Sequence, residues 1–145
     1  MGVSRAEITR LCRVIRDTMV VNDDYVEMER VLVIDLGSDT VIAALGADTS
    51  ISRIDVAHSR FRTRDGLRVG TSLQSLLNRR GLSAGIGEAT VQASVAAHCG
   101  LTLVLSGKGG GQQGDEFTRD QLAHWPRSIH VKRILVNGCR SGNAS

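Results

Sequence analysis

The sequence has few aromatic residues, a single proline and no long hydrophobic run. Phe, Trp and Tyr together make up 3% of the 145 residues, and the only proline is Pro126. With so few rings, the core has to be built from Val, Ile, Leu and Ala. No apolar run is long enough to cross a membrane as a helix. Hydrophobic residues at 41% and charged residues at 23% are typical of a folded globular protein.

Motifs for metals, cofactors and catalysis are also missing. The three cysteines form no CxxC pair, and no Cys/His cluster has zinc spacing. The acidic stretch at 22–29 lacks the glycine and the ligand spacing of an EF-hand loop, so we expect a solvated loop there. We predict a non-catalytic protein without metal or cofactor. An enzyme that uses Cys12 or a histidine is the less favoured alternative.

The hydrophobic patterns predict elements in the order helix, strands, helix, strands. Residues 4–17 predict a helix that opens with a Ser4–Glu7 capping box. Residues 71–81 predict a second helix. Residues 118–125 predict a short third helix with a Thr118–Gln121 capping box, and we expect Trp125 to anchor it to the sheet. Apolar runs rich in β-branched residues predict the strands: RVLVIDL, TVIAAL, ISRIDVAH, ATVQASVA, LTLVLS and IHVKRILV. The GSD between the first two runs predicts a hairpin turn. The first helix is expected to bury one stripe, made of Ile8, Leu11, Cys12 and Ile15.

The connections between these elements are too short for repeated helical crossovers, which favours an antiparallel sheet. The two main helix starts are also alike, because MGVSRAEI and VGTSLQSL share a glycine followed two residues later by a serine. This similarity indicates a duplicated unit. We predict an α+β protein of two related helix-plus-antiparallel-sheet halves, residues 1–60 and 61–145, in one compact unit.

One stretch resembles a nucleotide site. LTLVLSGKGGGQQGD runs from a strand into a glycine-rich turn with Lys108, and it resembles the phosphate-binding loop of the partitioning and septum-site ATPases. The second GK[ST] of such loops is absent, because residues 112–114 read QQG. Asp115 and Glu116 follow, and their charge repels phosphate. We predict a mobile loop in which Lys108 is solvated, and no binding of ATP or GTP.

Positive charge is densest in SRFRTRDGLRVG, although the net charge of the whole chain is only +3. This stretch predicts a basic contact surface and offers an alternative function, a small cytoplasmic module that binds nucleic acid. Interspersed acids and scarce aromatic rings for base stacking count against that alternative. The arginines concerned are Arg60, Arg62, Arg64 and Arg68.

The cysteines leave two possibilities open. Cys99 ends one predicted strand region and Cys139 follows another, so a disulfide between them would hold the C-terminal half together in an oxidising compartment. Three unrelated buried thiols are equally compatible with the spacing.

Residues 51–81 carry the longest resemblance to known proteins. They follow the pattern I-x-R-I-x-V, then S-x-R-F-x-T, then G-L-x-V-G-[ST] and a short helix that ends in glycine. This pattern resembles small bacterial envelope proteins, many of them uncharacterised lipoproteins or periplasmic domains. The unit of strand, glycine, serine or threonine and helix also resembles the repeat of the β-lactamase-inhibitor-protein-like fold, and GVSRAEITRLC is similar to the same motif.

The resemblance implies a non-catalytic envelope or secreted domain that binds a protein or peptide. It implies that Phe61 packs in the core and that Thr63 orders the turn into the second half. It also favours the Cys99–Cys139 disulfide, since the periplasm is oxidising. The start MGVSRAEITR has no hydrophobic signal core. We therefore expect a periplasmic or secreted protein if the native start lies upstream, and a cytoplasmic one if Met1 is the true start.

Overall fold

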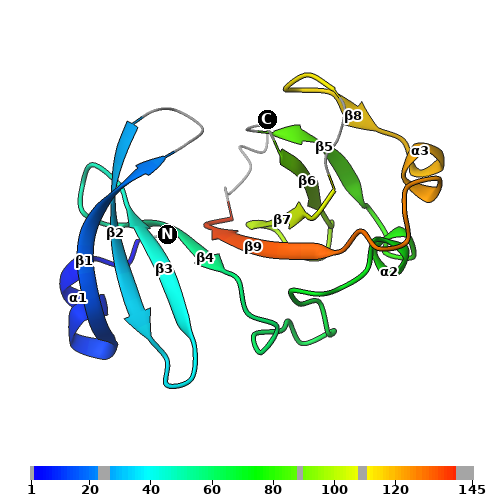
Figure 1. Ribbon diagram of the computed structural model, residues 1–145. Helices are drawn as coiled ribbons and strands as arrows, with labels where there is room; N and C mark the ends of the chain where they lie inside the picture. Colours follow the sequence, from blue (N-terminus) through cyan, green and yellow to red (C-terminus); the bar gives the residue numbers. More distant parts are fainter. Residues whose placement is uncertain (1, 23–26, 88–89, 108–110, 140–145) are drawn as a thin grey trace, which may run out of the picture. The chain divides into compact units, whose positions relative to one another are not determined.

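The computed structural model describes residues 2–22, 27–87, 90–107 and 111–139 (Figure 1). These residues form three helices and nine strands, and they divide into two units. The first unit runs from Met1 to Val56 and takes in the chain from Val136 onward, and the second runs from Ala57 to Leu135. Strands outnumber helices and pair mostly antiparallel, so the protein is a sheet-rich α+β protein, in agreement with the predicted class.

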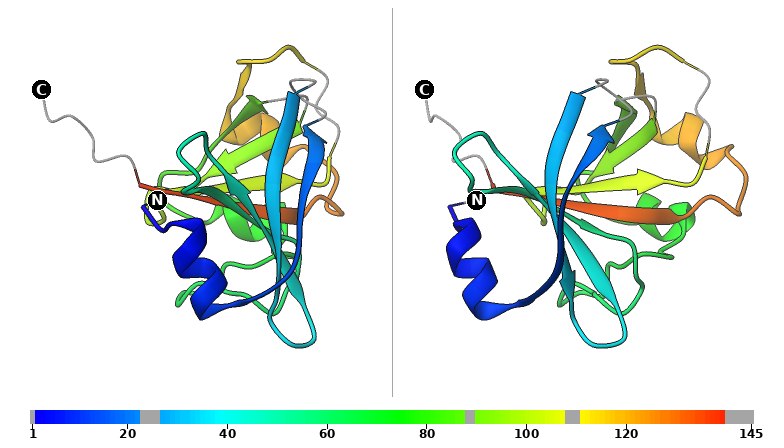
Figure 2. Two further views of the ribbon diagram at one scale, coloured as in Figure 1. Left: turned by 90° about the vertical axis from the view of Figure 1, so that its left-hand side faces the viewer. Right: turned by 60° about the vertical axis from the view of Figure 1, so that its left-hand side comes forward.

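The first unit is one helix followed by four strands. The strands pair antiparallel in chain order, and the first two form a long, visibly twisted hairpin (Figure 2). Ala44 pairs with Arg53 and Leu45 pairs with Ile51, so Ser52 is the extra residue at a bulge in the fourth strand. The elements are α1 (Arg5–Leu11), β1 (Arg13–Asn22), β2 (Glu27–Asp35), β3 (Thr40–Leu45) and β4 (Ile51–Val56).

The first helix is shorter than predicted. It begins at the expected capping box, with Ser4 as N-cap and Glu7 as its partner, but it ends at Leu11. The predicted buried stripe is wrong, because α1 buries no residue, Leu11 is 70% exposed and Ile15 is 51% exposed. The stretch RVIRDTMVVN is rich in Val, Ile and Thr and pairs with β2 instead. Cross-strand pairing of these β-branched side chains outweighs the helical spacing.

The second unit contains the remaining two helices and most of the remaining strands. Its strands lie in the order β9, β7, β6, β5, β8, and the last two residues of β9 belong to the first unit. Strands β5 and β8 were not predicted from the sequence. The elements are α2 (Leu73–Leu77), β5 (Ser83–Gly87), β6 (Thr90–Ser94), β7 (Leu101–Leu105), β8 (Glu116–Phe117), α3 (Arg119–Ala123) and β9 (Val131–Asn137).

The core of the second unit is closed by its two helices. Leu73 and Leu76 of α2 and Leu122 of α3 are at most 1% exposed. Helix α3 begins with the predicted capping box of Thr118 and Gln121. The ring of Trp125, just beyond α3, meets Phe117 of β8 edge to face at 4.8 Å between ring centres. The predicted role of this tryptophan, to anchor the last helix to the sheet, agrees with this contact.

Helix α1 is attached to the start of β4 by two backbone hydrogen bonds. The N–H of Arg5 donates to the carbonyl of Thr49 at 3.1 Å, and the N–H of Ile51 donates to the carbonyl of Val3 at 2.8 Å. The N-cap residue Ser4 lies between these two bonds, so the helix start adds a short bridge to the last strand of its unit.

Helix α2 is attached to the start of β9 in the same way. The N–H of Leu73 donates to the carbonyl of Ile129 at 2.9 Å, and the N–H of Val131 donates to the carbonyl of Thr71 at 2.8 Å. Here Ser72 is the N-cap between the two bonds. Each unit therefore joins a Gly-x-Ser helix start to the first residue of its last strand.

Candidate functional site

The four arginines predicted as a contact surface lie on one loop between β4 and α2. We call residues 60–71 the arginine loop. The side chains of Arg60, Arg62, Arg64 and Arg68 are all exposed. Within the described part of the chain, no carboxylate pairs with Arg62, Arg64 or Arg68. The loop therefore presents positive charge that its surroundings do not neutralise.

A tight turn at the centre of the loop is organised by Thr63. Its backbone N–H donates to the carbonyl of Leu67 at 2.9 Å, and its carbonyl accepts the N–H of Gly66 at 3.0 Å. Its hydroxyl oxygen accepts the N–H of Leu67 at 2.9 Å. Gly66 has φ +86°, a conformation that glycine adopts without strain. Thr63 thus orders the turn, as the resemblance to envelope proteins implies.

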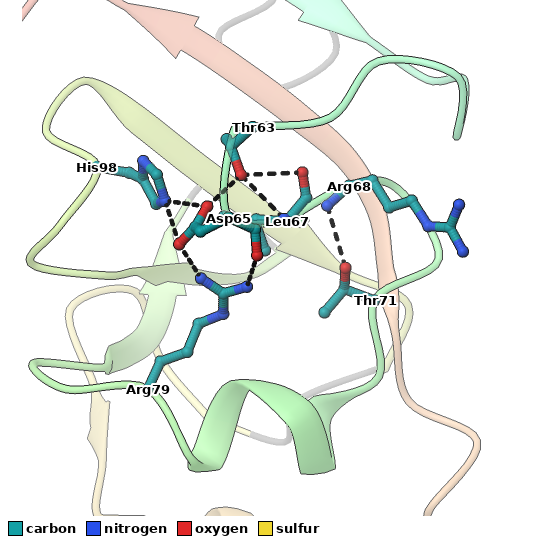
Figure 3. Close-up of polar contacts among 7 residues, drawn as sticks. All are labelled: Thr63, Asp65, Leu67, Arg68, Thr71, Arg79 and His98. Atoms are coloured by element: carbon teal, nitrogen blue, oxygen red, sulfur yellow. Dashed lines mark hydrogen bonds and ion pairs between the residues drawn. The ribbon is translucent and has the colours of Figure 1, made fainter.

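The backbone of the arginine loop is held by one buried side chain and by hydrogen bonds at its C-terminal end. Leu67 is fully buried, and the N–H of Gly70 donates to the carbonyl of Val131 at 2.7 Å. The N–H of Arg68 donates to the hydroxyl of Thr71 at 3.1 Å (Figure 3). These contacts hold the backbone while the arginine side chains point to solvent.

The single carboxylate within the loop, Asp65, is bound by three side chains (Figure 3). The hydroxyl of Thr63 donates to it at 2.5 Å. The Nε2–H of His98 donates to its two oxygens at 2.9 and 3.0 Å, and the guanidinium of Arg79 donates at 2.5 Å. Arg79 follows α2 and His98 lies in the turn between β6 and β7, so Asp65 ties three segments together.

These donors hold the pKa of Asp65 well below its ordinary value. The Thr63 hydroxyl makes the largest contribution and His98 the next, and Arg79 adds a hydrogen bond and a favourable charge. Asp65 is therefore ionised at neutral pH, and its charge is matched by Arg79. The charges of Arg62, Arg64 and Arg68 are not matched by a carboxylate of the described structure.

Two of those arginines are paired directly across the turn. Arg62 and Arg68 form an antiparallel bridge, which places two like charges opposite each other. Such a pair is unfavourable for stability in itself. The loop tolerates this repulsion because Leu67 and the Asp65 contacts hold its backbone.

Sequence reasoning located the arginines but missed the residues that hold them. Asp65, Arg79 and His98 are far apart in the sequence, and no local spacing pattern connects them. The Thr-x-Asp spacing at 63–65 and the Asp65–Gly66 dipeptide were the local signals of an ordered turn. The expectation for Phe61 was too strong, because its side chain is half-buried rather than part of the core.

The two cysteines predicted to form a disulfide, Cys99 and Cys139, are both in the disulfide-bonded state, and Cys12 is a free cysteine.

Lys108, the lysine of the glycine-rich loop, lies outside the described residues. The last part of its loop, residues 111–115, is exposed, and its backbone is hydrogen-bonded to β5. The N–H of Gly114 donates to the carbonyl of Ile86 at 2.9 Å, and the N–H of Ile86 donates to the carbonyl of Asp115 at 2.8 Å.

A second exposed surface lies on the β1–β2 hairpin of the first unit. Val21 and Met28 are directly paired, and Met19 is two residues before Val21 on the same face. Their exposed fractions are 57%, 59% and 47%. We call these three residues the apolar hairpin. Strand β1 is the first strand in the sheet order, so this apolar group lies beside a sheet edge.

Among the described residues, no group of three or more His, Cys, Asp or Glu side chains is placed to hold a metal ion. The same residues contain no helix that is both long and apolar enough to span a membrane.

Together, the fold and the site define a sheet-rich α+β protein with an ordered, exposed cationic loop. Among solved structures, the chain is similar to the uncharacterized protein YfeY from Escherichia coli, with a TM-score of 0.60. The two chains are 20% identical, and the match covers 94% of this chain and 90% of YfeY. No protein-family model and no curated protein matches the sequence. At this identity the likeness to YfeY shows the fold alone.

Proposed function

We propose that this protein is a non-catalytic binding domain of the bacterial envelope or exterior, and that it binds an acidic segment of a protein or peptide through the arginine loop. The observation that carries the proposal is the charge arrangement of the loop. Arg62, Arg64 and Arg68 are exposed and have no acidic partner in the described structure, while Asp65 is bound internally.

Arginine is suited to this role because its planar guanidinium matches a carboxylate with two parallel hydrogen bonds. The hydrogen bonds of Thr63 and the buried Leu67 order the backbone before a partner arrives. Less conformational entropy is then lost on binding than with a disordered basic segment. The loop has the properties of a preorganised receptor for carboxylates.

The state of the cysteines supports the compartment. Disulfides persist mainly in oxidising compartments, such as the bacterial periplasm or the cell exterior. Cys99 and Cys139 are disulfide-bonded, and the resemblance of residues 51–81 to envelope proteins favours the same location.

The duplicated architecture belongs to the same proposal. We infer two related halves of an inhibitor-like kind, each a helix followed by four antiparallel strands. The matching bridges of Ser4 to Ser50 and of Ser72 to His130 support this inference. In the second half, β8 and α3 are inserted between the third and fourth strands of the plan.

The experiment measures binding of a fluorescein-labelled oligoglutamate peptide by fluorescence anisotropy at low and physiological salt. The test variant is Arg62→Gln/Arg64→Gln/Arg68→Gln. The matched control, Arg10→Gln/Arg16→Gln/Arg127→Gln, removes three exposed arginines elsewhere, so both variants fall from a net charge of +3 to zero. We expect the test variant to bind at least about tenfold more weakly and the control about as well as the parent.

Equal losses in the two variants would show that only net charge matters and would contradict the proposal. A second candidate, binding of nucleic acid, rests on the same arginines, and a single-stranded oligonucleotide of equal charge tests it. The half-buried Phe61 is the one aromatic residue of the loop, and it offers little surface for base stacking. Tighter binding of the oligonucleotide than of the peptide would favour this second candidate.

A further inference from the structure

A depression beside α3 combines two aromatic rings with a carboxylate that no cation pairs with in the described structure. It has a volume of about 490 Å³ and is lined by Phe117, Asp120, Gln121, His124 and Trp125. All five residues belong to β8, α3 or the turn that follows α3, so the depression lies within the second unit. It is separate in sequence from the arginine loop.

The surrounding structure holds these side chains in place. Leu122, 1% exposed, attaches α3 to the core, and the guanidinium of Arg119 donates to the carbonyl oxygens of Leu77 and Arg79. The edge-to-face contact of Trp125 with Phe117 sets the direction of the indole ring, with 68° between the ring planes. The depression is therefore formed before any ligand binds.

The charge of the depression is negative. In the described structure, no donor contacts the carboxylates of Asp120 or Glu116, and both residues are exposed. The neighbouring cation, Arg119, donates to the carbonyls of Leu77, the last residue of α2, and Arg79, and it does not pair with either carboxylate.

The polar groups inside the depression offer hydrogen-bond acceptors to a ligand that carries donors. The Nδ1–H of His124 donates to the carbonyl of Asp120 at 2.6 Å, and Nε2, the other ring nitrogen, can accept a hydrogen bond when it carries no proton. The Asp120 carboxylate offers two further acceptor oxygens. Gln121 uses its Oε1 in the capping box, where it accepts the N–H of Thr118 at 2.8 Å.

We propose that this depression binds an arginine side chain of a partner peptide, with the guanidinium on the Trp125 ring and its N–H groups on Asp120. Guanidinium groups stack on aromatic faces and pair with carboxylates through two hydrogen bonds, and arginine does both better than lysine. The negative charge of the depression and its acceptors select the cation. This site is independent of the arginine loop, which selects carboxylates.

Trp125 is the only tryptophan of the chain, so its fluorescence reports on this site alone. The probe is acetyl-Gly-Arg-Gly-amide, and the neutral control peptide is acetyl-Gly-Gln-Gly-amide. We expect a saturable change in Trp125 emission with the arginine peptide that weakens as salt is raised. No comparable change is expected with the glutamine peptide.

The decisive variant is Asp120→Asn, which keeps the shape of the side chain and removes its charge. We expect its affinity for the arginine peptide to fall at least about tenfold. The matched control, Glu116→Gln, removes a neighbouring carboxylate outside the depression, and we expect it to stay within about twofold of the parent. Far-UV circular dichroism and the melting temperature establish that each variant is folded.

The proposal is overturned if folded Asp120→Asn binds as tightly as the parent, or if both peptides change the emission alike. A second measurement follows Trp125 emission of the protein alone at increasing protein concentration. The proposed peptide site is also overturned if this emission depends on concentration and if the Arg62→Gln/Arg64→Gln/Arg68→Gln variant abolishes that dependence. A second copy of the chain would then be the occupant. Unchanged binding of the arginine peptide by that triple variant supports a site independent of the loop.

Discussion

The two units have similar helix starts but differ in what they bury. Each has a Gly-x-Ser helix start bridged to its last strand. In the second unit α2 buries Leu73 and Leu76, whereas α1 buries no residue. All of the large apolar side chains that are exposed in the described structure belong to the first unit: Val3, Leu11, Ile15, Met19, Val20, Val21, Met28, Leu36 and Ile42.

The second unit buries the apolar residues of its helices, whereas the first unit leaves large apolar side chains exposed. The second unit closes its core with α2 and the inserted α3, and it can therefore hold a charged loop and an aromatic depression in defined positions. The first unit leaves apolar surface beside a sheet edge, where a contiguous apolar group is typical of interaction with another protein.

Placing the same charge in both units should give the largest contrast. Val104 of β7 is fully buried and Val21 of β1 is 57% exposed. We expect Val104→Lys to destabilise the protein by more than about 4 kcal/mol, because a charge is buried without a partner. Val21→Lys should change stability by less than about 0.5 kcal/mol. Urea denaturation followed by circular dichroism measures both, and similar losses would contradict the difference between the units.

Reduction of the predicted Cys99–Cys139 bond should have the next largest effect. A disulfide that closes a loop of this size typically contributes about 2–4 kcal/mol, and Cys99→Ser should remove that contribution. Cys12→Ser is the control, because Cys12 is a free cysteine. Thiol titration of the unfolded, unreduced protein should find one free thiol per chain, and three after reduction. Three free thiols before reduction would exclude the bond.

Removing the N-caps of α1 and α2 tests whether the two helix starts contribute equally to the free energy of unfolding. Ser72→Ala should lower global stability by about 1 kcal/mol, because α2 is packed into the core. Ser4→Ala removes an equivalent cap, but α1 buries nothing and can fray alone. We expect faster amide exchange in α1 and little change in the midpoint of global unfolding. A full loss of global stability in Ser4→Ala would show that α1 is part of the cooperative core.

Asp65→Asn should give the smallest effect on stability, with a defined dependence on pH. The pKa of Asp65 is lowered by folding, so its ionised form stabilises the native state above the pKa of the unfolded carboxyl, about 3.9. The melting temperature of Asp65→Asn should lie below that of the parent at neutral pH. The difference should shrink as pH falls from about 5 to about 2. Glu116→Gln is the control, and a difference independent of pH would contradict the assignment.

Sequence patterns were most reliable where local chemistry decides the structure. The capping boxes at Ser4 and Thr118 are present as predicted, and so is the hairpin between β2 and β3, where Gly37 turns with φ +99°. Strand β5 was missed because SAGIG has little β-propensity of its own. Its pairing with β6 and β8 makes it a strand, and a Cβ on Gly85 would lie 2.5 Å from the carbonyl oxygen of Asp115.

The sequence by itself determined the class of fold, the two helix starts and the stretch of arginines, because capping, β-propensity and charge density act between neighbours in the chain. Only the tertiary structure decided where α1 ends, which apolar residues are buried and how the arginine loop is held. Asp65 meets Arg79 and His98 only when α2 and the β6–β7 turn come together. Contacts between residues far apart in the sequence follow from packing, which no local pattern records.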